Sequence, residues 1–222
     1  FKNRPSILEI VINMKRQLVS IGAVLLVCSL IMCVGQAQIP DKFFEEYSKI
    51  EASQNEMDTI FNSYWDQQSK RIEYATNNKN NPNIDYVYII SMLKSEQLLL
   101  DELSNKKATY STEVNKFYEN VKEIKGDEAK SKANDLTITL RKSEQYLGNT
   151  LLRYKTATNS IGVIMNYYAT DANFSNQDVI DDIKNQDLNA RMSFEEGNNF
   201  LGQYYLAKQE ANATYQELLK MK

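Results

Sequence analysis

The chain has 222 residues, of which 26 are Lys or Arg and 29 are Asp or Glu, and it contains no histidine. Without histidine the commonest general base and imidazole metal ligand are missing, and catalytic triads that depend on an imidazole cannot form. Seven glycines and three prolines are too few for a turn-rich β protein, so we expect an all-α fold.

Residues 14–37 have the pattern of a secretory signal. Two basic residues precede an uncharged apolar run over 18–34, and small residues follow at Gly35 and Ala37. Small side chains one and three residues before the cut are typical of signal peptidase sites, so we predict cleavage between Ala37 and Gln38. As a helix the apolar run would span about 25 Å, less than the roughly 30 Å hydrocarbon core of a bilayer, which favours a cleaved signal.

Two alternatives to cleavage stay open. An uncleaved segment would anchor the protein in a membrane through residues 18–34, with the basic flank inside. Lipidation is disfavoured because it requires a cysteine after a small residue, whereas Cys28 follows valine and Cys33 follows methionine. Residues 1–13 precede the first methionine and are interpreted as an upstream extension.

Residues 38–222 are enough for one helical domain with its own core. Both cysteines precede the predicted cut, so the mature chain would be cysteine-free and stabilised by packing without disulfides. From Asp41 onward acidic residues outnumber basic ones by six, and no basic stripe occurs. We therefore expect no nucleic-acid partner.

Three polar stretches, at 77–83, 125–128 and 168–178, divide this domain into four long segments. The first contains a proline, which disfavours helix at the preceding residue, and the second contains a glycine, which is common just beyond helix ends. We expect helices over about 41–76, 84–124, 127–168 and 177–220.

Apolar residues recur in each segment at alternating steps of three and four, which is the pattern of a bundle seam. The second segment has two exceptions on its seam, Glu96 and Lys107, and the first segment has three, Gln54, Gln68 and Arg71. Long helices with short connections predict an elongated, coiled-coil-like, up-and-down antiparallel four-helix bundle. Pairing of the same seams between two chains is the alternative.

The charged residues on the second seam suggest how the second and third helices align. A hairpin about residues 125–126 would place Glu96 opposite Lys155 and Lys107 opposite Glu144. Each pair joins opposite charges, and Glu96 and Lys107 have the same spacing along the chain as Glu144 and Lys155. We therefore predict two ion pairs that specify the register while adding little stability.

Tyrosine is abundant, with 14 copies, and four tyrosines fall at one end of the predicted bundle. Tyr86 and Tyr88 begin the second helix, and Tyr167 and Tyr168 end the third, so an up-and-down bundle brings them to the same end. A tyrosine ring buries apolar surface while its hydroxyl reaches water, which suits either packing or binding. This end is the candidate binding surface.

Two sequons are candidate glycosylation sites in an exported chain: Asn173 in a predicted loop and Asn212 within a predicted helix. Residues 171–182 lack the glycine and the final glutamate of a calcium loop. No nucleophile, base and orienting group can be assembled. We therefore expect no catalytic site, metal or cofactor.

The sequence predicts an exported, non-enzymatic helical bundle that acts by protein binding or self-association at the cell envelope or outside the cell. The alternative is an extracytoplasmic bundle that binds a small ligand or a metal. Contact with a membrane is expected only through the N-terminal segment, if that segment is not cleaved.

Overall fold

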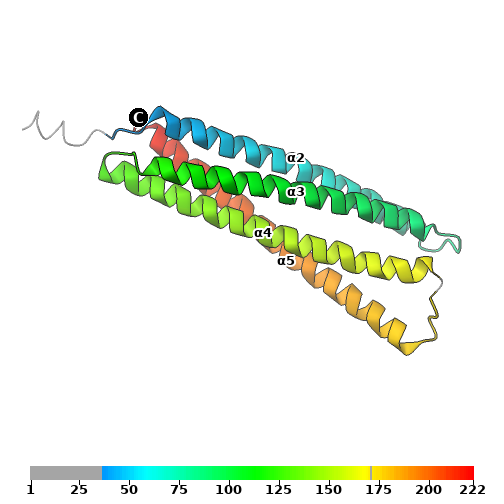
Figure 1. Cartoon of the computed structure of the whole chain (residues 1–222). Helices are drawn as coiled ribbons and strands as arrows, with labels where there is room; N and C mark the ends of the chain where they lie inside the picture. The colour runs from blue at the N-terminus through cyan, green and yellow to red at the C-terminus, as the bar shows by residue number, and fades with distance from the viewer. Residues whose placement is uncertain (1–36, 171) are drawn as a thin grey trace, which may run out of the picture.

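The computed structural model describes residues 37–170 and 172–222, and within them the chain is an all-helical bundle (Figure 1). Helix α2 spans Asp41–Asn77, α3 spans Tyr86–Val121, α4 spans Asp127–Ala169 and α5 spans Gln177–Leu219. The expected all-α bundle is therefore confirmed. The predicted signal or anchor helix lies outside the described residues, and none of the four described helices is apolar enough to cross a membrane.

Two of the helices begin with side-chain caps. The Asp85 carboxylate accepts a hydrogen bond from the Tyr88 amide at 2.8 Å, so α3 starts just after it. The Asn176 side chain accepts one from the Asp178 amide at 3.0 Å, and α5 follows. Each cap satisfies a backbone N–H group that has no partner inside the helix, which fixes where the helix begins.

The turn between α3 and α4 is tied to the segment that precedes α2. Gln38 and Lys125 exchange two backbone hydrogen bonds of 3.1 Å each. Gly126 has φ of +96°, a conformation that favours glycine, and a Cβ built there would lie 3.3 Å from the Ala37 Cα. Because the chain bends into this turn, α3 ends at Val121, earlier than the predicted residue 124.

Helices that follow one another in the sequence pack together, and Figure 1 shows that they alternate in direction. We call the half around the 122–126 turn and the C-terminus the near half (37–59, 104–148 and 198–222). The other half, around the loops at 78–85 and 170–176, is the far half (60–103 and 149–197). The contiguous core reaches from Ile39 in the near half to Tyr64 and Tyr154 in the far half.

Large aromatic rings fill most of this core. The largest fully buried side chains are Tyr64, Tyr110, Tyr154, Tyr204, Phe43, Phe61 and Phe117. The interface between α4 and α5 differs because small residues line it, among them Ala157, Ser160, Ala190, Ser193 and Gly197. A Cβ added at Gly197 would lie 2.6 Å from the Tyr154 ring, so this glycine permits the close approach of the two helices.

In the far half the first turns of α5, before Ala190, leave the packing. No residue of α5 before Ala190 is buried, and Leu188 exposes 58% of its surface. Figure 1 shows the beginning of α5 diverging from the other helices. The first turns of α5 therefore contribute no buried side chain, and the Tyr167 hydroxyl, 2.7 Å from the Asp182 carboxylate, contacts them from α4.

Candidate functional site

Five aromatic side chains gather at the far end of the bundle. Tyr86 of α3 stacks on Tyr168 of α4 with ring centroids 5.1 Å apart, and Tyr168 stacks in turn on Phe174 at 5.2 Å. Tyr88 packs edge-on against Tyr74 of α2 at 4.8 Å. Stacked and edge-to-face contacts restrict the positions of aromatic rings. We call these five residues the aromatic end.

Three rings of the aromatic end stay open to solvent. The exposed fractions are 46% for Tyr88, 36% for Tyr168 and 41% for Phe174, and the neighbouring Val87 exposes 67%. An exposed cluster of rings that support one another provides a large apolar contact area without further ordering. This geometry can bind an apolar surface.

The structure places the fourth predicted tyrosine differently. The Tyr167 hydroxyl donates a hydrogen bond to the Asp182 carboxylate of α5 at 2.7 Å, and this bond raises the pKa of Tyr167. Tyr74 and Phe174 were not predicted from the sequence as members of this cluster. Tyr74 could have been found, because it ends the first helix close to the loop that leads to Tyr88, whereas the loop position of Phe174 gave no signal.

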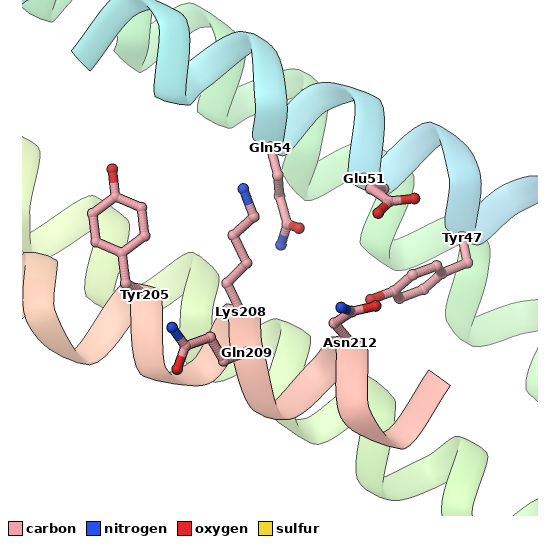
Figure 2. Close-up of a pocket in the computed structure, with 7 residues that line it drawn as sticks. All are labelled: Tyr47, Glu51, Gln54, Tyr205, Lys208, Gln209 and Asn212. Carbon is pink, nitrogen blue, oxygen red and sulfur yellow. The ribbon is translucent and has the colours of Figure 1, made fainter. Parts of the chain in front are cut away.

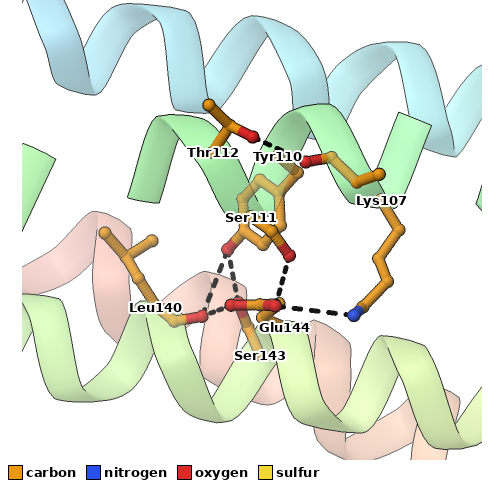
Figure 3. A network of polar contacts seen from close by, with 8 residues as sticks. Lys107, Tyr110, Ser111, Thr112, Leu140, Ser143 and Glu144 are labelled. Carbon is orange, nitrogen blue, oxygen red and sulfur yellow. Dashed lines mark hydrogen bonds and ion pairs between the residues drawn. The ribbon is translucent and has the colours of Figure 1, made fainter. Parts of the chain in front are cut away.

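One of the two predicted register pairs is present. Lys107 lies 3.4 Å from the Glu144 carboxylate, and the Ser111 hydroxyl donates to the same carboxylate. These contacts belong to a polar network in the near half (Figure 3). Its buried member is the Tyr110 hydroxyl, which lies 2.5 Å from the Ser143 hydroxyl and also accepts a hydrogen bond from the Gln54 amide at 3.2 Å.

The other predicted pair, Glu96 with Lys155, is wrong. Glu96 is fully buried and instead receives two hydrogen bonds from the Arg71 guanidinium of α2, at 2.6 and 3.3 Å. Lys155 pairs with Asp101 at 2.7 Å. Burial raises the pKa of Glu96, and the neighbouring Arg71 offsets part of that effect.

The error has a geometric cause. The prediction aligned residues at equal heights on the two helices, but helical side chains lean toward the N-terminus of their own helix. In an antiparallel pair, the side chains that meet therefore belong to residues a few positions further along the chain. Asp101 stands in the place predicted for Glu96, and Ser111 meets Glu144 alongside Lys107.

A second candidate site is a groove between α2 and α5 in the near half, with a volume of about 230 Å³ (Figure 2). We call it the α2–α5 groove. Its lining residues are Tyr47, Glu51 and Gln54 of α2 and Tyr205, Lys208, Gln209 and Asn212 of α5. The groove could not be predicted from the sequence, because it lies between helices that are far apart in the chain.

Both predicted sequons are accessible in the structure. Asn173 is exposed in the loop between α4 and α5, and Asn212 is exposed on α5 beside the α2–α5 groove. A glycan on Asn212 would crowd the rim of that groove. Among the described residues no group of three or more carboxylate or thiol side chains is arranged to hold a metal ion.

The fold and these two surfaces define an all-α bundle with an exposed aromatic end and a polar groove. No family model, no curated protein and no solved structure matches the chain. Function therefore has to be inferred from the arrangement of the side chains.

Proposed function

We propose that the protein is an exported, non-enzymatic helical bundle that binds a protein partner through its aromatic end. The observation that carries this proposal is the cluster of three exposed rings, Tyr88, Tyr168 and Phe174, supported by Tyr74 and Tyr86. Tyrosine and phenylalanine are enriched in the centres of protein interfaces, where they supply contact area.

The opposite end of the bundle provides the contrast that favours binding over ordinary packing. There the Phe43 and Phe117 rings lie 4.5 Å apart and are fully buried. This pair of rings is enclosed, whereas the Tyr88, Tyr168 and Phe174 rings are exposed. Because the exposed rings lie against other rings, a partner would meet them already ordered, which lowers the entropic cost of association.

The charges around the aromatic end indicate what the partner surface would offer. Asp85 caps α3, and Asp178 lies in the first turn of α5. A complementary partner would present an apolar pocket with a basic rim. This charge pattern would chiefly raise the rate of association, and added salt would reduce that effect.

Export rests on the predicted signal. We expect protein recovered from outside the cytoplasm to begin at Gln38, and mass spectrometry of the intact protein measures this directly. Recovery of a chain that still carries residues 18–34 would instead establish the anchored alternative.

Binding at the aromatic end can be tested with a photo-cross-linking amino acid in place of Tyr88, in cells that produce and export the full chain. Tyr118 is the matched control, because it is also an exposed tyrosine of α3 but lies in the near half. We expect one discrete protein adduct from position 88 and none from position 118. Equal adducts from both positions, or none from either, would contradict the proposal.

The cross-linked species also distinguishes a foreign partner from a second copy of the chain. An adduct with twice the mass of the protein would show self-association. In that case light scattering should report a dimer that becomes monomeric when Tyr88 and Tyr168 are both replaced by Ser.

A further inference from the structure

The α2–α5 groove exists because large side chains keep these two helices apart. No Cα atom of α2 lies within 8 Å of one in α5, in contrast to α4 and α5, which meet through small residues. Contact is made by long side chains: Tyr47 stacks on Tyr215 with centroids 3.9 Å apart, and Lys208 reaches Asp58 at 2.5 Å. Space remains between these contacts, and its lining combines five polar or charged side chains with two tyrosine rings.

The strongest donors at the groove are already occupied. The Lys208 ammonium donates to the Asp58 carboxylate at 2.5 Å and to the side-chain amide oxygen of Asn55 at 3.5 Å. The Gln54 amide nitrogen donates into the core, to the Tyr110 hydroxyl, at 3.2 Å. These contacts leave the carbonyl oxygen of Gln54 without a hydrogen bond from any described residue.

Acceptors and negative charge remain unmatched. Glu51 lines the groove and forms no ion pair with any described residue. Behind Lys208, one oxygen of Asp58 is buried and has no hydrogen-bond partner in the described structure. Asp58 neutralises the Lys208 ammonium, so Glu51 is the one carboxylate of the lining that has no ion-pair partner among the described residues.

The two phenols that line the groove do not change this balance at neutral pH. Burial and the nearby Asp58 raise the pKa of Tyr205 to about 12. Burial and the Glu51 carboxylate likewise raise the pKa of Tyr47. Both hydroxyls therefore stay protonated, and their oxygens can also accept hydrogen bonds.

We propose that the α2–α5 groove binds a small organic cation that carries a primary ammonium group. Glu51 is the counter-ion, and the Gln54 carbonyl oxygen accepts a second hydrogen bond of the ammonium. The amides of Gln209 and Asn212 contact the body of the ligand at the rim. A volume of about 230 Å³ lies below the roughly 300 to 1,000 Å³ of sites for drug-sized ligands, so only a small molecule fits.

This site is independent of the aromatic end. The groove lies in the near half, and the aromatic end lies at the tip of the far half. Loss of either activity would therefore leave the other unchanged, and the two proposals can fail separately.

The test uses three probes of similar size and different charge: propylammonium, 1-propanol and propionate. Each is titrated into the full ¹⁵N-labelled chain in a non-ionic detergent, and the side-chain amide signals of Gln54, Gln209 and Asn212 are followed by NMR. We expect saturable shifts of these signals with propylammonium only. A ligand of this size should have a Kd on the order of 1 mM.

Glu51→Gln is the decisive variant, and Glu102→Gln is its control. Glu102 is also an exposed helical glutamate, and the control removes the same charge away from the groove. We expect Glu51→Gln to weaken propylammonium binding at least tenfold and Glu102→Gln to leave it unchanged. Absence of saturable shifts, equal shifts with 1-propanol or propionate, or an equal loss in both variants would overturn the proposal.

Discussion

The near and far halves of the bundle are built from the same kind of helix but hold together differently. Both halves bury large aromatic rings, but in the near half all four helices contribute buried side chains, among them Phe43 and Phe117. The far half buries an ion pair, Arg71 with Glu96, and loses α5 before Ala190. Hydrophobic burial is the main source of stability, so the near half holds the fold and the far half is freer to present a binding surface.

The largest expected effect comes from breaking the buried ion pair of the far half. Arg71→Met leaves the fully buried Glu96 carboxylate without a partner and should lower the free energy of unfolding by about 3 to 5 kcal/mol. Replacing both residues, as Arg71→Met with Glu96→Met, should recover most of this loss. Denaturant unfolding of the three proteins measures both effects, and equal losses in the single and double variants would show that the pair is not the cause.

The buried Glu96 also predicts that the stability of the fold depends on pH. Because the pKa of Glu96 is raised in the folded state, its contribution is most favourable below the unfolded value of about 4.5 and is lost as pH rises through the folded pKa. The stability difference, wild type minus Glu96→Gln, should therefore fall as pH increases from about 4 to 7. A difference that rises over this range would contradict the assignment.

The junction of α4 and α5 decides how firmly α5 is held. Gly197→Ala would place a methyl group against the Tyr154 ring, which Trp65 and Phe194 already contact, and should cost about 1 to 3 kcal/mol. Gly202→Ala, on the same helix, meets no atom within 4 Å and should stabilise by about 0.5 to 1 kcal/mol. Thermal unfolding of both variants checks the contrast, and similar shifts in the two would be inconsistent with close packing at Gly197.

Two buried tyrosine hydroxyls of the near half differ in their hydrogen bonding. Tyr110→Phe removes a hydroxyl that bonds with Gln54 and Ser143 and should destabilise by about 1 to 2 kcal/mol. The Tyr204 hydroxyl is buried and has no hydrogen-bond partner among the described residues, so Tyr204→Phe should be neutral or slightly stabilising. Unfolding in urea distinguishes them. A loss for Tyr204→Phe equal to that for Tyr110→Phe would indicate that Tyr204 has a partner such as a water molecule.

The smallest effect is expected for the ion pairs at the edge of the α3–α4 hairpin. Lys155→Ala and Lys107→Ala each remove a partly exposed pair, with Asp101 and Glu144, and should cost about 0 to 1 kcal/mol. Raising the salt concentration should reduce even this difference. A loss above 2 kcal/mol at either position would mean that these pairs stabilise the fold as well as aligning the helices.

The sequence predicted the helices well because helical periodicity is a local property. The second helix was identified although Glu96 and Lys107 interrupt its seam. The pairing of Glu96 could not be read in the same way, because it depends on which helix lies opposite. Arg71 and Glu96 were both recognised as seam exceptions, but only the observed packing shows that these exceptions satisfy each other.

The candidate sites differ in the same way: the one set by the order of the helices could be predicted, and the one set by packing between distant helices could not. Tyr86 and Tyr168 were predicted to lie at the same end, because an up-and-down bundle fixes which helix ends lie together, and the structure shows in addition that their rings stack. The α2–α5 groove was not predicted, because its shape depends on side-chain sizes across helices that are distant in the chain. Glu51 and Lys208 are ordinary surface charges in the sequence, and only the fold places them at one groove.

Hydrogen exchange along α5 tests most directly the claim that the two halves differ. We expect the backbone amides of residues 182–189 to exchange at least about tenfold faster than those of residues 204–216, because the first segment packs only partly and the second is held by the near half. Measuring both segments by mass spectrometry within one helix makes each the control for the other. Equal protection of the two segments would contradict the account.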